Sequence, residues 1–164
     1  MTPTPLYSLF CYKSELWAGG DGLILYNNQK DDYWRTLDQN NGTPSGKIFD
    51  LYANDSHLWI GSSRGLARIN STTLRADPIG IESIFQNMSI FDIDSIDNSL
   101  WIASQAGVFI YSNIHSQLMQ MSDIGRKNFP EQLRNVASID YYDGEVFVAS
   151  DIGIVKYDME EREW

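Results

Sequence analysis

The sequence predicts an all-β fold, because a strand-like segment followed by a glycine turn occurs four times in its 164 residues. The copies are LWAGGDGLILY, LWIGSSRGLARI, LWIASQAGVFIY and VFVASDIGIVKY, and they begin at Leu16, Leu58, Leu100 and Val146. These first residues lie 42, 42 and 46 positions apart. Repeats of about 40–50 residues that contain several short strands are typical of β-propellers. We therefore expect a β-propeller built of four-stranded antiparallel blades, with four blade repeats in this chain.

The second repeat shows the order of strands expected within a blade. Residues 47–52 (KIFDLY) favour a strand, and the polar turn 54–56 separates them from the apolar run LWIGS. Gly65 then turns the chain into a third strand over residues 66–69, and a weaker fourth strand follows over residues 74–78. No segment of useful length has the period of a helix, so we expect a domain that is nearly all β.

The other repeats have the same order of elements. First strands are expected to begin ten residues before each copy, near Leu6, Ile48, Ile90 and Val136. Tight turns are expected at residues 13–14, 54–56, 97–98 and 143–144, of which Asp143-Gly144 is the strongest signal for a type I′ turn. A glycine follows each second strand, where a tight turn favours positive φ, at Gly22, Gly65, Gly107 and Gly153.

A large aromatic side chain recurs on the second strand of each blade, at Trp17, Trp59, Trp101 and Phe147. Neighbouring blades pack face to face, and such a side chain fills the gap between them. Its burial contributes about 4–6 kcal/mol as an upper value. A lone repeat leaves an apolar face uncovered and should not fold by itself.

The whole chain, residues 1–164, is expected to be a single propeller domain, either partial or self-assembling. Its blades are expected at about 5–40, 46–80, 88–122 and 135–164, and the last lacks most of its outer strand. Three arrangements stay open. The chain can belong to a longer propeller of about seven blades, form half of an eight-bladed ring made by two copies, or close alone as four blades. An open arc would expose two large apolar faces.

The repeats resemble the bacterial two-component regulator propeller repeat, in which a strand, a polar turn and LWIGT precede Gly-Leu and a third strand. LWIGSSRGLARIN is the nearest match, and VFVASDIGIVKYD keeps the Tyr-Asp ending. The departures are Ala103 and Ala149 in place of Gly, Val146-Phe147 in place of Leu-Trp, and one residue fewer before Gly22. The resemblance implies the sensor region of a bacterial hybrid histidine kinase, hence a periplasmic or extracellular location.

Composition excludes some classes of function. The net charge is −10, which argues against a nucleic-acid partner because phosphates would be repelled. No apolar run approaches the roughly 18 residues of a membrane span, so no direct membrane insertion is expected. The N-terminus MTPTPLYSLF shows no signal peptide.

No catalytic constellation, metal site or cofactor site is predicted. His57 and His115 are expected in surface turns, without a second His or Cys at ligand spacing. Cys11 is expected to be a buried small hydrophobe. The FDIDSIDNS segment lacks the Gly and Glu of a calcium loop, and Asp50 and Asp92 are expected to bond neighbouring backbone amides rather than line a channel.

The candidate binding face carries the turns between second and third strands and the connections between blades. The turns contribute Asp21, Arg64, Gln105 and Asp151, which differ between copies while the framework repeats. The longest connection, residues 122–135, adds Arg126, Lys127 and Arg134, whose cations suit a carboxylate or a sugar ring. The alternative is a solvated loop whose Phe129 and Leu133 pack on the core.

We therefore expect a non-enzymatic module for ligand sensing or protein interaction. Its partner would be an unidentified small molecule or glycan, or another protein. The alternative is a purely structural unit that forms a homo-oligomer or joins further blades of a longer chain. An enzyme that uses the central face is the least favoured hypothesis, because the sequence names no catalytic residues.

Overall fold

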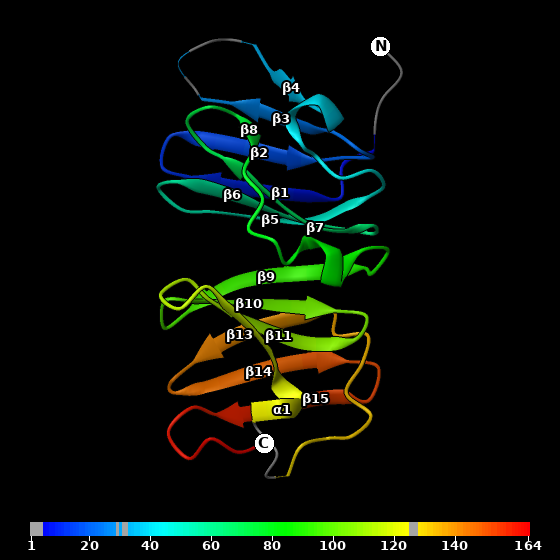
Figure 1. The fold of residues 1–164 in the computed structure, drawn as a ribbon, viewed down its shortest axis with the longest axis vertical. Coiled ribbons are helices and arrows are strands. Elements are labelled where there is room, and N and C mark those ends of the chain that lie inside the picture. Colours follow the sequence, from blue (N-terminus) through cyan, green and yellow to red (C-terminus); the bar gives the residue numbers. More distant parts are fainter. Residues whose placement is uncertain (1–4, 29, 31–32, 125–127) are drawn as a thin grey trace. The chain divides into compact units, whose positions relative to one another are not determined.

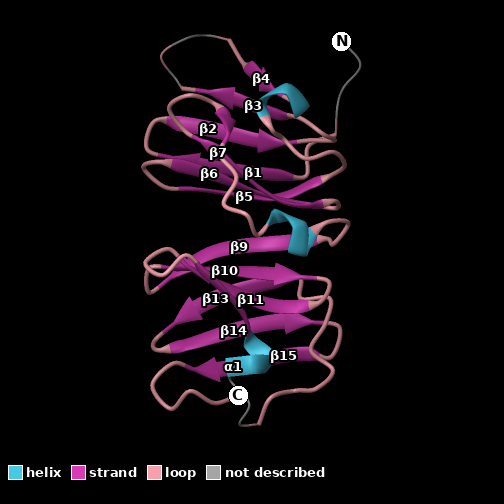
Figure 2. Ribbon diagram, viewed as in Figure 1, coloured by secondary structure: helices cyan, strands magenta, loops and turns pink. Residues whose placement is uncertain are grey.

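A computed structural model describes residues 5–28, 30, 33–124 and 128–164 of the chain (Figure 1). These residues form four antiparallel sheets, three with four strands and one with three (Figure 2). The chain divides into two compact units, Met1–Ile90 and Phe91–Trp164. The all-β prediction is confirmed, and the strand order of each sheet is consistent with propeller-like blades.

The first unit holds sheets 1 and 2, in which consecutive strands are neighbours. Sheet 1 consists of β1 (Ser8–Tyr12), β2 (Glu15–Gly19), β3 (Ile24–Asn27) and β4 (Arg35–Leu37). Sheet 2 consists of β5 (Ile48–Ala53), β6 (His57–Ser62), β7 (Gly65–Asn70) and β8 (Arg75–Ala76). The short helical turns η1 (Gln39–Asn41) and η2 (Glu82–Phe85) follow these sheets and were not expected from the sequence.

The second unit holds sheets 3 and 4. Sheet 3 consists of β9 (Ile90–Ile96), β10 (Ser99–Ser104), β11 (Gly107–Ser112) and β12 (Gln117–Gln120), and the helical turn α1 (Met121–Ile124) follows it. Sheet 4 consists of β13 (Ser138–Tyr142), β14 (Glu145–Ser150) and β15 (Gly153–Asp158). At the outer edge of β15, an isolated bridge pairs Asp158 with Glu163.

The predicted tight turns are confirmed. The first two strands of the sheets are joined at residues 13–14, 54–56, 97–98 and 143–144. Both residues have positive φ at Asp97-Asn98 and at Asp143-Gly144, as a type I′ turn requires. Positive φ is also found at each predicted turn glycine: 69° at Gly22, 135° at Gly65, 116° at Gly107 and 112° at Gly153.

A serine three residues before the glycine closes three of the turns between second and third strands. Ser62 Oγ donates to Gly65 O at 2.9 Å and accepts from Arg64 N at 3.1 Å. Ser104 makes the same pair of bonds with Gly107 and Ala106, and Ser150 makes longer ones with Gly153 and Ile152. The sequence shows this Ser-x-x-Gly spacing, and its role is to satisfy the backbone of a buried turn.

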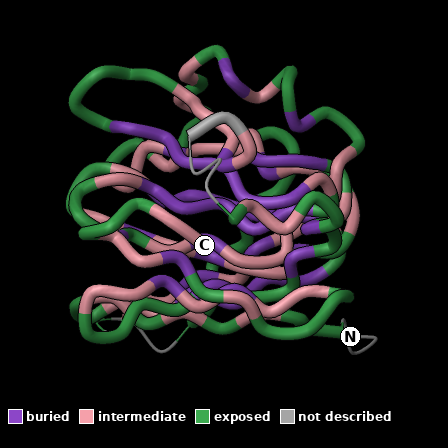
Figure 3. Tube along the Cα trace, turned by 90° about the horizontal axis from the view of Figure 1, so that it is seen from below, coloured by how far each residue is buried: buried purple, intermediate pink, exposed green. Residues whose placement is uncertain are grey.

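Each unit is held together by packing between opposite faces of its two sheets. We call the face that carries the second-strand aromatic the front face and the other the back face. In the first unit, front residues of sheet 1, including Trp17 and Ile24, form one cluster with back residues of sheet 2, including Leu51 and Leu58. In the second unit, Trp101 on the front of sheet 3 joins the cluster of sheet 4's back face. Many of the buried residues therefore lie in strands, and Figure 3 marks the buried residues along the Cα trace in purple.

Two sequence expectations on burial differ from the structure. Trp17, Trp59 and Trp101 are buried, but Phe147 on the front of sheet 4 is only half-buried. Cys11 was expected to be buried and is exposed. In β1, Phe10 and Tyr12 take the front face, so the alternation of a strand places Cys11 on the back of sheet 1.

We predict that Trp101→Ala lowers the free energy of unfolding by about 3–5 kcal/mol, because it empties a fully buried site. Phe147→Ala should cost less than half as much, since solvent already reaches that ring. Urea unfolding of both variants measures the difference. Equal losses would contradict the packing described for the two front faces.

Substitutions at two glycines, Gly107 and Gly153, can distinguish the cost of backbone strain from the cost of close packing. Gly107 and Gly153 have nearly equal φ, but a Cβ on Gly107 would lie 3.1 Å from Leu133 O, whereas a Cβ on Gly153 meets nothing within 4 Å. Alanine at either position costs about 1–3 kcal/mol through φ alone. We predict a larger loss of melting temperature for Gly107→Ala than for Gly153→Ala, because only the former must also displace a backbone carbonyl.

Candidate functional site

The residues predicted to bind a ligand lie on exposed turns and connections. Asp21, Arg64, Gln105 and Asp151 occupy the turns after β2, β6, β10 and β14, and their residues are exposed. Arg134 is also exposed, in the connection that precedes β13. The predicted residues Arg126 and Lys127 lie outside the described residues.

In the second unit, the structure brings three of these residues together around Asn135. The backbone N–H of Asn135 donates to Gln105 O at 3.0 Å, and its side-chain amide donates to Asp151 Oδ2 at 2.9 Å. Arg134 immediately precedes Asn135 in the chain. Gln105, Arg134 and Asp151 therefore form one polar group at this end of the unit, with Asn135 as a member that the sequence did not single out.

In the first unit, Asp21 and Arg64 both lie beside the segment that leads into β5. Asp21 forms an isolated bridge with Lys47, and Gly22 N donates to Gly46 O at 2.7 Å. A Cβ on Gly46 would come within 3.1 Å of Arg64 Cγ. The main chain of these turns thus connects one sheet to the start of the next, while the side chains of Asp21 and Arg64 stay available to solvent.

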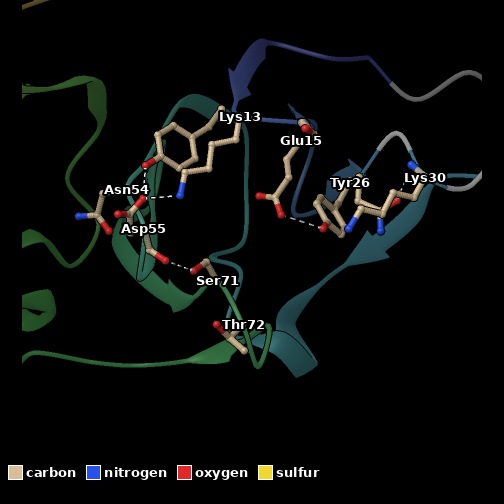
Figure 4. A pocket seen from close by; sticks show the side chains of 11 residues that line it. Lys13, Glu15, Tyr26, Lys30, Asn54, Asp55, Ser71 and Thr72 are labelled. Atoms are coloured by element: carbon tan, nitrogen blue, oxygen red, sulfur yellow. Dashed lines mark hydrogen bonds and ion pairs between the residues drawn. The ribbon is translucent and has the colours of Figure 1, made fainter.

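A polar groove of the first unit lies at the opposite end of its sheets, and the sequence did not point to it. It is an open groove of about 440 Å³ between the first and third turns of sheets 1 and 2 (Figure 4). Its lining includes two tyrosines, two lysines, two carboxylates and several hydroxyl and amide groups: Tyr12, Lys13, Ser14, Glu15, Tyr26, Asn28, Lys30, Asn54, Asp55, Ser71 and Thr72.

One wall of the groove is organised by Asp55, in the turn between β5 and β6. Tyr12 Oη donates to Asp55 Oδ1 at 2.5 Å, and Lys13 Nζ donates to the same oxygen at 2.6 Å (Figure 4). The hydrogen bonds from Lys13 and then Tyr12 hold the pKa of the Asp55 carboxyl below its usual value. The same carboxylate raises the pKa of Tyr12 and of Lys13, chiefly through these hydrogen bonds.

The other wall is built from β2 and β3. Tyr26 Oη donates to Glu15 Oε1 at 3.1 Å, and the Glu15 carboxylate points toward the open space of the groove (Figure 4). Lys30 lies beyond Tyr26 at the same wall. Among the described residues of the lining, two lysines stand beside two carboxylates, in a protein whose net charge is −10.

This arrangement suits binding better than proton transfer. Tyr12 and Lys13 keep their protons and Asp55 stays ionised at neutral pH, because each pKa moves away from neutrality. A general acid or base works best with a pKa near the working pH. The groove therefore offers fixed donors and acceptors, together with two aromatic rings, to a polar ligand.

The second unit has a groove of different character. It measures about 380 Å³ and is lined mainly by apolar side chains of sheets 3 and 4, among them Trp101, Met119, Met121, Tyr157 and Met159. Burial raises the pKa of Tyr157. The thioethers of methionine adapt to irregular apolar surfaces, so this groove offers packing rather than directed hydrogen bonds.

His57, which the sequence analysis considered as a metal ligand, has a structural role. His57 was expected in a turn, but it begins β6, where its Nε2 lies 2.8 Å from Asp77 Oδ2. Arg68 bonds the same Asp77 oxygen at 3.1 Å and lies over the Trp59 ring. This half-buried cluster ties β6 and β7 to the segment after β8.

Asp92 bonds the neighbouring strand, as the sequence favoured. Its Oδ2 accepts from Ile139 N at 2.6 Å and from Ser138 Oγ at 3.0 Å, which joins β9 to β13. Desolvation raises the pKa of nearby Asp94, and the charges of Asp92 and Asp140 add to this. Among the described residues, no three His, Cys, Asp or Glu side chains are grouped to hold a metal ion.

Comparison with known proteins finds likeness in structure alone. No protein-family model matches the chain, and no curated protein matches its sequence. The fold is similar to an extracellular domain assigned to the one-component system BT4673 of B. thetaiotaomicron, with a TM-score of 0.74 and 16% identity. The alignment covers 94% of this chain and 20% of that one, so this chain spans about a fifth of that domain.

Two other solved structures have a similar fold. The computationally designed Ika4 protein has a TM-score of 0.70 at 12% identity, over 95% of this chain and 92% of that one. The WD40 β-propeller domain of Doa1 has a TM-score of 0.64 at 20% identity, over 96% of this chain and 52% of that one. At these identities the likeness shows the fold, which is all-β and propeller-like. Among the described helices, none is long and apolar enough to cross a bilayer.

We predict a pH dependence of stability from the Asp55 cluster. Folding lowers the pKa of Asp55 below its ordinary value of 3.8. The stability that its ionised carboxylate contributes is therefore complete above pH 3.8 and is lost as the pH falls through the lower pKa of the folded state. The contribution of Lys13 is complete below 10.5 and is lost as the pH rises through its raised pKa.

Urea midpoints of the wild type and Asp55→Asn, measured across this pH range, test the assignment. The difference should be constant near neutrality and shrink in strong acid. Glu131→Gln, at an exposed position outside the groove, controls for the loss of one negative charge. A difference that persists unchanged below the folded pKa would contradict the assignment.

Proposed function

We propose that this chain is a non-enzymatic module for ligand sensing or protein interaction that works outside the cytoplasm. The observation that carries the proposal is the groove of the first unit, whose donors, acceptors and two tyrosines sit on a propeller-like scaffold. The likeness to an extracellular domain of a one-component system supports the location and the sensing role. The same likeness and the repeat pattern support a periplasmic or extracellular position in a bacterium.

The groove favours a small, neutral, polar ligand. A molecule with several hydroxyl groups, such as a glycan, could accept from Lys13 and donate to Glu15 while it packs against Tyr12 or Tyr26. The group around Asn135, with Arg134, Gln105 and Asp151, is the second candidate surface, and it is the one that the sequence predicts. It suits a carboxylate or a partner protein, because its exposed arginine supplies a cation with several hydrogen-bond donors.

A structural role is the second candidate function. Four propeller-like blades would then serve to assemble the chain with a second copy, for example into an eight-bladed ring, or with blades of a longer chain. The observation that favours it is the exposure of apolar side chains on sheets 1 and 4. An enzyme remains the least favoured hypothesis. At neutral pH Tyr12 and Lys13 keep their protons and Asp55 stays ionised, so none of these three side chains is suited to proton transfer.

A binding screen tests the sensing proposal. The purified chain is mixed with a panel of neutral and acidic oligosaccharides, amino acids and dicarboxylates, and retained mass is measured by native mass spectrometry. We expect saturable binding of a neutral oligosaccharide, reduced about tenfold or more by Glu15→Gln combined with Tyr26→Phe, which remove a charge and a hydroxyl with little change in volume.

The matched control is Arg126→Ala combined with Arg134→Ala, on the face that the sequence predicts. Loss of binding in this variant alone would move the site to that face and reject the groove. A panel without any saturable binder would count against the sensing proposal and in favour of the structural one. Melting temperatures of both double variants show whether a loss of binding reflects a loss of fold.

A further inference from the structure

The back of sheet 1 exposes apolar side chains at positions that are buried where the chain repeats them. Leu9 is 68% exposed, whereas the residues at the same distance before the later copies, Leu51, Ile93 and Ile139, are 1%, 4% and 5% exposed. Leu6 is 50% exposed, whereas its equivalents Ile48 and Val136 are fully buried. Apart from Ile93, these buried equivalents lie on back faces that another sheet of their own unit covers.

The front of sheet 4 shows the same pattern from the other side. Ile154 pairs with Ala149 as Ile24 pairs with Gly19, so the two isoleucines occupy equivalent positions. Ile154 is 77% exposed, whereas Ile24 is fully buried against sheet 2. Phe147, which pairs with Lys156 on this face, is likewise only half-buried.

The first unit shows how such faces fit together. The ring of Phe10 on the front of sheet 1 lies 6.1 Å from that of Tyr52 in sheet 2, and Ser8 Oγ donates to Ile48 O at 3.2 Å. Beside them, Lys13 Nζ of sheet 1 pairs with Asp55 of sheet 2. A front face therefore meets a back face through apolar contacts along the strands and a charge pair at the turns.

The turns between the first and second strands of sheets 4 and 1 carry opposite charges at equivalent positions, Asp143 and Lys13. Asp143 precedes its repeat by three residues, as Lys13 and Asp55 precede theirs. If the front of sheet 4 meets the back of sheet 1 in the same geometry, Asp143 takes the place of Lys13 and Lys13 takes the place of Asp55. An ion pair forms again with its signs exchanged, and Lys13 has ammonium protons beyond the one it gives to Asp55.

We propose that a second copy of this chain covers these faces, with the front of sheet 4 in one copy packed on the back of sheet 1 in the other. Phe147 and Ile154 then cover Leu6, Leu9 and Cys11, and Asp143 pairs with Lys13. A second copy is the occupant because the chain itself carries both complementary faces. Two such contacts leave neither face open, whereas one contact would lead to longer chains.

The inference names a partner for the interaction module proposed above, and among the residues it uses, Lys13 also lines the ligand groove. The front of sheet 4 is more polar than that of sheet 1, since Asp140 replaces Phe10 and a Glu145–Lys156 ion pair replaces the Glu15–Tyr26 bond. We therefore expect a concentration-dependent dimer rather than a permanent one.

Sedimentation velocity and native mass spectrometry across a micromolar concentration series test the proposal on the full chain. We expect a species of twice 18.7 kDa that dissociates on dilution. Leu9→Asp and Asp143→Lys should each weaken association about tenfold or more. Lysine tolerates the backbone at position 143, because Lys13 has φ of 53° at the equivalent place and Asp143 has φ of 50°.

The control is Ile114→Asp, at a residue that is 75% exposed in the turn between β11 and β12. It introduces the same charge outside both faces and should leave the dimer intact. Alkylation of Cys11 gives an independent readout, because its equivalent Ala53 is buried between sheets. The thiol should react more slowly in the wild-type dimer than in Asp143→Lys.

Three outcomes would overturn the proposal. One is a monomer at every concentration with a reactive Cys11, which means that the faces stay uncovered. Another is a monomer with a protected Cys11, which means that the chain covers its own faces. The last is a dimer that Leu9→Asp and Asp143→Lys do not weaken. None of these outcomes bears on ligand binding in the groove, which Glu15→Gln combined with Tyr26→Phe reports separately.

Discussion

The packing of one sheet's front face on the next sheet's back face is the interaction on which the rest of this structure depends. In a repeat array each sheet leaves an apolar face exposed until a neighbouring sheet covers it, so the sheets depend on one another for stability. Trp17 and Trp101 are among the largest fully buried side chains, and each belongs to the cluster between the sheets of its unit. The polar groove exists because this packing brings turns of two sheets side by side, with Asp55 of one opposite Tyr12 and Lys13 of the other.

Much of the fold could be predicted from the sequence because its signals are local. Tight turns such as Asp143-Gly144 and the glycines after each second strand need particular φ values, and these depend on a few residues. Burial depends on what lies across a face, which is not local. Cys11 sits in a strand that looks like the others, yet it is exposed.

The candidate site was harder to predict for a related reason. The predicted face follows from the variation of turn residues such as Gln105 and Asp151, which the structure places around Asn135. The groove of the first unit arises between two sheets, from turns about 40 residues apart. Its signal was the opposite charge of Lys13 and Asp55 at equivalent turn positions, which carries meaning only once the sheets are known to pack in sequence order.

The hydrogen bonds that join successive sheets have a consequence for how the chain can change. Ile48 N donates to Gly20 O at 2.9 Å, and Val136 N donates to Ser104 O at 3.0 Å, so sheets 2 and 4 start from the same point of the preceding turn. The connections that lead there differ in length, from β4 to β5 and from β12 to β13. Strand register is thereby uncoupled from loop length. Insertions or exchanged segments in these connections can alter what the surface recognises while the framework keeps its alignment.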